Sequence, residues 1–291
     1  MHGLFVKIVS FLLSIFSMLA LQARNPTFPN PYKKVDMSKF TETFSDEFDG
    51  DIDYTVWGDH HAAEGKSTVR RGSYWNKNIA YTENSNLVIP VRYLEDGMGG
   101  TGAGWYTAGL DTSGREEGST GFSQKFGYFE TRCILPKGAD LWSAFWLMNN
   151  DVGNIDGSGQ DGTEVDIMES AFYGRKPFNN VVYCNLHYDG YGEEHRGKQV
   201  CWAYVKGNPY EEFNTYGVEW NENEYIFYIN GMEYARSDFG GVCQNPLYMI
   251  LSVEMSGADG VTSGRDNSAN PDLETEFLVD YVKVYQYNDL L

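Results

Sequence analysis

Glu164-Val165-Asp166-Ile167-Met168-Glu169 holds three carboxylates within six residues, separated only by apolar side chains. Side chains of a β-strand alternate between its two faces, so Glu164 and Asp166 point one way and the apolar residues next to them point the other. Strict alternation would put Met168 on the carboxylate face and Glu169 behind it. One extra residue around Ile167 or Met168, a β-bulge, would return Glu169 to the other two acids. The stretch therefore predicts a bulged strand with three acids on one face.

Such an acidic face is costly, because the three carboxylates repel one another and lose solvation when they are buried. Without the bulge, the alternative is a solvated acidic edge strand. Two carboxyl groups about 5–5.5 Å apart are the equipment of a retaining glycosidase, and a wider gap suits inversion. Asp166 lies between Glu164 and Glu169 and would couple their titration. Retaining chemistry needs one acid protonated near neutral pH while the other is ionised.

Composition limits the classes of partner. The chain has 291 residues and a formal net charge of −19. The length suits one large all-β domain. The negative charge argues against nucleic acid and anionic membranes as partners, and it makes a heavily sulfated polysaccharide a less favourable substrate. Aromatic residues make up 15% of the chain, with 21 Tyr and 7 Trp. Such rings can pack in a core or stack against sugars.

The first 23 residues have the pattern of a signal peptide. Lys7 supplies the positive region, Ile8 to Leu21 the apolar region, and Leu21-Gln22-Ala23 a cleavage site. The apolar run falls short of the roughly 20 residues that span a bilayer. We therefore expect removal of residues 1–23, secretion to an extracellular or periplasmic location, and no membrane insertion. Residues 24–40, with three prolines, are expected to form a linker or an arm along the domain.

From Phe44 onward, short apolar or alternating runs recur between turn signals, and no segment keeps a helical period over three turns. Asn230-Gly231, between two such runs, predicts a two-residue hairpin. Many short strands joined by glycine-rich turns indicate a sandwich or a barrel. The sequence shows no internal repeat, so we expect a single domain over residues 41–291. Further runs of this kind are Asn86–Ile89, Phe126–Leu135, Trp142–Met148, Val181–His187, Thr215–Trp220, Leu247–Val253 and Phe277–Tyr287.

The four cysteines, Cys133, Cys184, Cys201 and Cys243, match no zinc-site spacing. Disulfides are chemically allowed in an exported protein. Cys184 and Cys201 could pair, and four buried free thiols are an equal alternative.

The order of these motifs resembles glycoside hydrolase family 16. The acidic stretch is similar to the bulged Glu-x-Asp-x-x-Glu signature of that family, and the resemblance covers most of the chain after residue 40. The segments that carry it, besides residues 164–169, are Phe44–Gly50, Phe126–Arg132, Leu141–Leu147, Tyr216–Trp220, Tyr228–Gly231 and Val279–Tyr285.

The resemblance implies an all-β fold, the concanavalin A-like β-jelly-roll sandwich, with a glycan-binding cleft on its concave face. It also implies that Glu164 is the nucleophile, that Glu169 is the general acid/base, and that Asp166 assists between them. The bulged form indicates the laminarinase-like branch of the family.

Three further residues are candidates for substrate binding. Trp142 and Trp146 are four apart in one predicted strand, hence on one face, where rings can stack on sugar C–H groups or pack in a core. His187 resembles a histidine on the strand after the catalytic one, and we expect it to hydrogen-bond the acids. The resemblance also places Glu47 and Asp280 near a structural cation, usually calcium. A surface salt bridge or a turn cap is the alternative for each.

The sequence departs from the family pattern in three places. Ser143 stands where proline is usual, the loop from Asn149 to Gly162 is long and polar, and residues 187–195 do not have the common laminarinase form. These segments are expected to line the cleft, so they leave the polysaccharide open.

We therefore predict a monomeric, secreted, endo-acting retaining β-glycanase that hydrolyses β-1,3- or mixed β-1,3-1,4-glucan without a catalytic cofactor. A neutral β-galactan or a polylactosamine chain is the alternative substrate. Two further hypotheses are a non-catalytic glycan-binding sandwich and a calcium-dependent adhesion protein, whose metal would sit on the acidic strand. The apolar residues of that strand disfavour a calcium site, because calcium prefers flexible, oxygen-rich loops.

Overall fold

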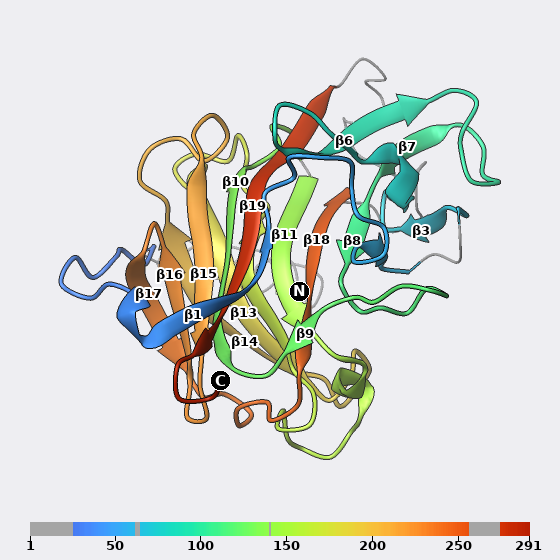
Figure 1. The fold of residues 1–291 in the computed structure, drawn as a ribbon. Coiled ribbons are helices and arrows are strands. Elements are labelled where there is room, and N and C mark those ends of the chain that lie inside the picture. Colours follow the sequence, from blue (N-terminus) through green and yellow to red (C-terminus); the bar gives the residue numbers. More distant parts are fainter. Residues whose placement is uncertain (1–25, 62–64, 140, 256–273) are drawn as a thin grey trace, which may run out of the picture.

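A computed structural model of the chain describes residues 26–61, 65–139, 141–255 and 274–291. Strands dominate this part of the chain, with three short 3-10 helices between them (Figure 1). The elements in order are η1 Met37–Lys39, β1 Phe40–Asp46, β2 Gly58–Asp59, β3 Thr68–Arg70, β4 Ser73–Trp75, η2 Lys77–Ile79, β5 Tyr81–Thr82, β6 Leu87–Leu94, β7 Gly104–Thr107, β8 Gly109–Asp111, β9 Ser123–Gln124, β10 Gly127–Ile134, β11 Leu141–Met148, η3 Asn150–Gly153, β12 Glu164–Ser170, β13 Val181–Tyr188, β14 Arg196–Tyr204, β15 Asn214–Trp220, β16 Tyr225–Ile229, β17 Met232–Ser237, β18 Leu247–Met255 and β19 Thr275–Tyr287.

The strands form two sheets, which confirms the predicted jelly-roll sandwich. One sheet has the order β14-β13-β12-β11-β18-β8-β2, with β9 paired to β18. The other has the order β17-β16-β15-β10-β19-β6-β7-β4-β3, with β1 paired to β19 and β5 to β6. The hairpin predicted at Asn230-Gly231 joins β16 to β17. Asn230 has a φ of 51° and Gly231 a φ of 69°, the left-handed pair that this turn requires.

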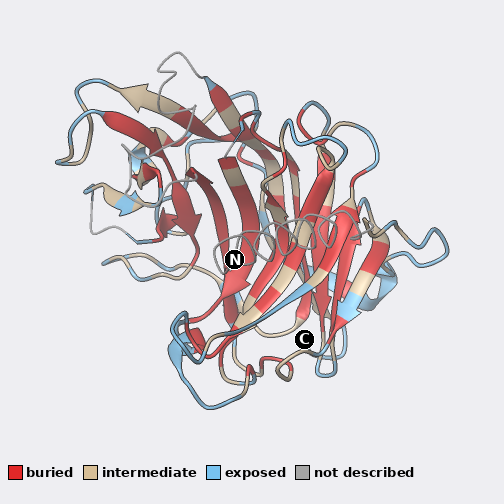
Figure 2. Ribbon diagram, turned by 180° about the vertical axis from the view of Figure 1, so that it is seen from behind, coloured by how far each residue is buried: buried red, intermediate tan, exposed pale blue. Residues whose placement is uncertain are grey.

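The main core lies between the two sheets, and the strands of both are largely buried (Figure 2). Strand β11 shows how the alternation of side chains divides core from cleft. Phe145 and Leu147 belong to the core cluster, while Trp142 and Trp146 point to the other face and line a cleft. The eight-stranded sheet therefore carries the core on one face and the candidate site on the other.

The predicted bulge is present in β12. Phe145 of β11 pairs with Met168, and the next residue, Trp146, pairs with Asp166, so Ile167 is the extra residue. Ile167 and Met168 both join the core cluster, whereas Glu169 returns to the cleft face. Two consecutive apolar residues on the core side are what bring the third acid beside the first two.

Residues 26–39 run along strand edges of the sandwich. Thr27 bridges Ala203 in β14, and Lys34 bridges Met232 in β17. The predicted signal segment, residues 1–23, lies outside the described residues. Among the described residues, no helix has the length and apolar character needed to cross a membrane.

All four cysteines are buried free thiols. Cys184 of β13 lies directly opposite Cys201 of β14, so the two thiols that could have paired face each other without a bond.

Candidate active site

A cleft of about 840 Å³ crosses the eight-stranded sheet. The acids of β12 lie in its wall, with neighbouring strands on both sides contributing the rest. Its lining residues are His60, His61, Arg70, Arg71, Trp142, Ala144, Trp146, Met148, Glu164, Asp166, Glu169, Asn185, His187, Tyr191, His195, Gly197, Lys198, Gln199, Ser252 and Glu254. The structure thus brings together six of the eight predicted site residues: the three acids, both tryptophans and His187.

Glu169 is held by two donors on the adjacent strands. Trp142 Nε1 donates to its Oε1 at 2.6 Å, and Asn185 Nδ2 donates to its Oε2. Burial raises the pKa of Glu169 to about 7, against the lowering effect of these two hydrogen bonds. A carboxyl group with this pKa carries its proton through mildly acidic solution, as a general acid must.

Glu164 has a different environment. Burial raises its pKa, while a hydrogen bond from Tyr191 and the positive charge of Arg70 act to lower it. Tyr191 donates its hydroxyl to Glu164 Oε2, which leaves Oε1 without a protein donor among the described residues. Burial raises the pKa of both glutamates, but Glu164 alone of the two has a nearby positive charge, that of Arg70, among the causes that favour its anion. Retaining chemistry needs such a difference between its two carboxyl groups.

Asp166 lies between them and is only 3% exposed. Burial, with the negative charges of Glu169 and Glu164, raises its pKa well above the usual range. Its Oδ2 lies 3.3 Å from His187 Nε2, although the two atoms are not aligned as a hydrogen bond. His187 Nδ1 in turn lies 2.9 Å from His195 Nε2. Burial lowers the pKa of His187 to about 4, so the ring is neutral near pH 7.

The two tryptophans differ in what they offer a substrate. Trp142 is partly exposed and packs beneath the Arg71 guanidinium, which lies 5.4 Å from the ring centroid. Trp146 is 7% exposed and donates its Nε1 to Ser252 Oγ at 3.1 Å. Both lie on the cleft face. The Trp142 side chain donates a hydrogen bond to Glu169, and Trp146 is the strand partner of Asp166.

Arg70 and Arg71 bring positive charge to the cleft of an acidic protein. Arg70 Nε donates to Glu254 Oε1 at 2.6 Å, and Arg71 Nε pairs with Oε2 of the same carboxylate. Each uses only Nε in these contacts, so among the described residues the terminal guanidinium nitrogens of both lack a hydrogen-bonding partner. Such paired forks suit hydroxyl groups or an anionic substituent of a glycan.

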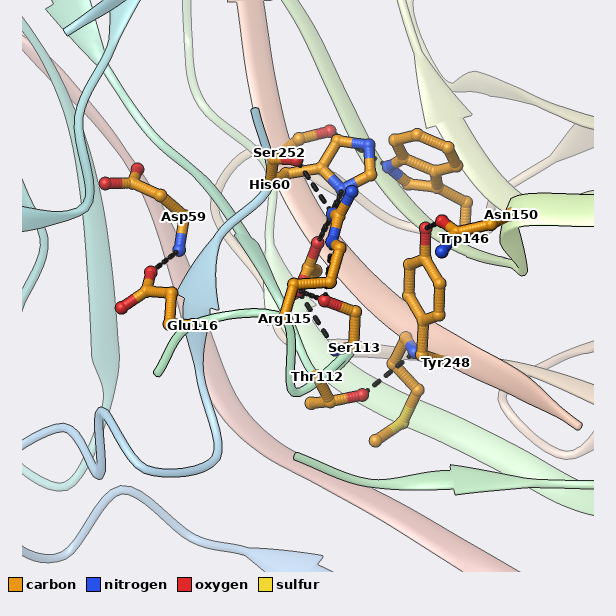
Figure 3. Close-up of polar contacts among 12 residues, drawn as sticks. Asp59, His60, Thr112, Ser113, Arg115, Glu116, Trp146, Asn150, Tyr248 and Ser252 are labelled. Atoms are coloured by element: carbon orange, nitrogen blue, oxygen red, sulfur yellow. Dashed lines mark hydrogen bonds and ion pairs between the residues drawn. The ribbon is translucent and has the colours of Figure 1, made fainter. Parts of the chain in front are cut away.

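His60 closes the cleft beyond Trp146. Its Nδ1 lies 2.7 Å from Asp111 Oδ2, and Arg115 binds both Asp111 and the His60 carbonyl. Figure 3 shows the Arg115 side chain extending toward the His60 ring, beside Trp146. The His60 and Trp146 rings meet edge to face, with centroids 5.1 Å apart. The dyad with Asp111 fixes the imidazole in one orientation at this end of the cleft.

The acids expected near calcium are engaged elsewhere. Glu47 pairs with Lys283 at 2.5 Å, and Asp280 pairs with Arg132. Both acids therefore form the salt bridges that were the alternative to a cation site. Among the residues that the structure describes, one group of three could approach a metal: Glu164, Asp166 and His187, with ligand atoms within 4.8 Å. Its imidazole does not suit calcium, which takes oxygen ligands.

Several residues of the site were not predicted from the sequence. Asn185 was within reach, because it lies two positions before His187 and so shares its face. Periodicity does not indicate the direction of the others, because Arg70 ends the three-residue strand β3 and Arg71, His60 and Tyr191 lie outside the named strands.

Comparisons with known proteins agree with this geometry. A family model described as the GH16 domain of β-porphyranases A–D matches residues 39–287. The endo-1,3-1,4-β-glycanase ExsH of Rhizobium meliloti is 28% identical over 273 residues, which cover 86% of this chain and 53% of that protein. The β-porphyranase B of Zobellia galactanivorans is 29% identical over 206 residues, 66% of each chain. The chain thus spans about half the length of the rhizobial relative.

Solved structures support the fold. The non-specific endo-β-1,3(4)-glucanase SCLam superposes with a TM-score of 0.65 at 22% identity and covers 91% of this chain and 97% of its own. The laminarinase catalytic domain of Thermotoga petrophila gives a TM-score of 0.62 at 23% identity, with 86% and 98% covered.

Proposed function

The chain belongs to glycoside hydrolase family 16, and from this membership and the site geometry we propose that it is an endo-acting retaining β-glycanase. The observation that carries the proposal is the bulged strand β12, which sets Glu164, Asp166 and Glu169 on one cleft wall with contacts that distinguish the two glutamates. The proposal agrees with the family resemblance read from the sequence.

In the first step, a Glu164 oxygen attacks the anomeric carbon and the glycosidic C–O bond breaks. The leaving oxygen takes the proton of Glu169, and a covalent glycosyl ester remains on Glu164. In the second step, water attacks the anomeric carbon and gives a proton to Glu169. The ester C–O bond then breaks and restores the Glu164 carboxylate. Burial and the two neighbouring glutamates raise the pKa of Asp166, which disfavours a further negative charge between them.

We propose β-1,3- or mixed β-1,3-1,4-glucan as the first substrate candidate, because the rhizobial relatives are named endo-1,3-1,4-β-glycanases. Partly exposed Trp142 offers a neutral sugar a face for stacking.

The second candidate is an anionic galactan, and Arg70 and Arg71 favour it. Their terminal guanidinium nitrogens, which have no partner within the described part of the chain, suit a sulfate ester, although the net charge of the whole chain opposes such a substrate. The matched family model is named for β-porphyranases, so porphyran belongs in any test.

The test is reducing-end release from laminarin, barley mixed-linkage glucan, agarose, porphyran, carrageenan and polylactosamine, with wild type beside Glu164→Gln. Cleavage of one glycan by wild type alone would support the activity and identify the substrate. Equal cleavage by both proteins would overturn the assignment of Glu164. Tight glycan binding without new reducing ends would favour the non-catalytic sandwich. If a chelator abolished glycan binding and the Glu164→Gln substitution had no effect, the calcium-dependent adhesion protein would be favoured.

Export after removal of residues 1–23 and a monomeric state remain predictions. Sequencing of the N-terminus of exported protein and light scattering would test them.

A further inference from the structure

Tyr191 lies on the loop between β13 and β14, in the segment where the sequence departs from the common family form. Gly190, with a φ of 66°, precedes it and Gly192 follows it. The residue is 63% exposed, yet its hydroxyl reaches into the cleft and donates to Glu164 Oε2. A largely exposed loop residue thus touches the proposed nucleophile.

The same loop is tied to the site through stacked rings. Tyr191 lies over His195, with ring centroids 6.1 Å apart and planes at 28°. His195 stacks on His187 at 5.0 Å and 16°. His187 then reaches Asp166 from β13. The stack gives the tyrosine a defined place above the acids.

The two glutamates differ in their support. Glu169 receives two N–H donors from residues of strands β11 and β13. Within the described part of the chain, the Glu164 carboxylate receives one hydrogen bond, and its donor is Tyr191. The loop therefore completes a contact that the sheet itself does not supply.

We propose that Tyr191 is a positioning residue for the nucleophile: its hydroxyl holds Glu164 Oε2 and directs Oε1 toward the anomeric carbon. This rests on the proposed function, since it assigns Glu164 the attacking role. The same donor stabilises the carboxylate that departs when the glycosyl ester breaks. Both steps gain from one hydrogen bond, the first by orientation and the second by charge stabilisation.

Other charged and titratable groups also face Glu164, and they influence its pKa as well. Arg70 comes from β3, Glu254 from β18, Asp166 from the same strand, and Tyr248 lies near Tyr191. The Tyr191 hydrogen bond lowers the pKa of Glu164, and so does Arg70, whereas Glu254 raises it. Removal of the hydroxyl alone should therefore raise the pKa of Glu164.

The kinetic test compares Tyr191→Phe with Tyr191→Ala on the glycan that wild type cleaves. Tyr191→Phe keeps the ring and its stacking, so we expect kcat to fall about 10- to 100-fold with KM nearly unchanged. The acidic limb of the pH profile should move to higher pH, because Glu164 must be ionised to attack. Tyr191→Ala should also raise KM. Tyr188→Phe, a nearby buried tyrosine on β13, is the control and should behave as wild type.

An aryl glycoside of the same glycan, with an activated leaving group, separates this role from acid catalysis. Tyr191→Phe should stay slow on it, since the nucleophile is affected and the leaving group is not. Wild-type kcat and an unmoved acidic limb in Tyr191→Phe would overturn the proposal.

A second measurement does not depend on turnover. In protein labelled with ¹³C at glutamate Cδ, the Glu164 signal is the one lost in Glu164→Gln, and its titration midpoint should rise in Tyr191→Phe. If wild type cleaves no glycan, the proposed function fails while this midpoint still decides whether Tyr191 holds Glu164. An unchanged midpoint would refute the contact.

Discussion

Acids with little exposure occur on both outer faces of the sandwich, but the three acids of β12 differ from Glu233 on the other face in their direct partners. In the cleft, burial raises the pKa of Glu164, Asp166 and Glu169. On the other sheet, Glu233 of β17 is also buried, yet hydrogen bonds and ion pairs with Arg236 and Lys33 lower its pKa. Burial alone therefore does not mark the site. What distinguishes its three acids is that, within the described part of the chain, none forms a direct ion pair with a lysine or an arginine.

The sharpest way to break this comparison is to neutralise one acid on each face. Glu164→Gln should abolish hydrolysis, with a loss of about 10⁴-fold, because no nucleophile remains. Glu233→Gln, the matched control, should keep the wild-type rate. Reducing-end assays on both proteins, with circular dichroism to verify folding, make the measurement. An active Glu164→Gln protein would remove the distinction between the two faces.

Replacing the proposed acid sharpens the difference within the cleft. Glu169→Gln should slow polysaccharide hydrolysis by about 10²- to 10⁴-fold, because the leaving oxygen receives no proton. An activated aryl glycoside needs less protonation, so formation of its glycosyl ester should recover, seen as a burst of released phenol. Equal losses on both substrates would argue that Glu169 is not the acid.

The basic limb of the pH profile reports the same group. Loss of the proton from Glu169 should make kcat/KM fall above about pH 7. Asn185→Ala removes a donor that favours the ionised form, so the pKa of Glu169 should rise and this limb should move up by about one pH unit or less. A shift to lower pH would contradict the assigned hydrogen bond.

Stability should change in opposite directions on the two faces. The pKa of Glu169 is higher in the folded chain than in the unfolded one, so its ionisation costs folding free energy as pH rises toward about 7. Glu169→Gln should therefore gain stability over wild type between pH 5 and pH 8, by roughly 2 kcal/mol. Glu233→Gln should lose about 1 kcal/mol, because its ion pairs favour the folded state. Urea unfolding at pH 5 and at pH 8 measures the free energy of unfolding of each variant relative to wild type.

The smallest expected effect concerns calcium. Lys283 and Arg132 already neutralise Glu47 and Asp280, so a chelator should leave the Tm unchanged. A fall in Tm on adding EDTA, reversed by calcium, would restore the site predicted from the resemblance.

The sequence was most informative where residue spacing determines direction. The alternation of β11 predicted that Trp142 and Trp146 share a face, and a mismatch of one residue predicted the bulge in β12. The two-sheet fold followed from many short runs, and the family resemblance supplied its topology. Spacing could not predict Tyr191, because the direction of a loop side chain depends on contacts made after folding. It also could not show that Arg70 and Arg71 share Glu254, since their strand is far from β18 in sequence.

The bulge has an evolutionary consequence. Ile167 and Met168 both face the core, so deletion of either would leave Glu-Val-Asp, one apolar residue and Glu, a strand with unbroken alternation. Its three acids would still share one face. A single codon therefore separates two strand forms that keep the same set of acids on one face.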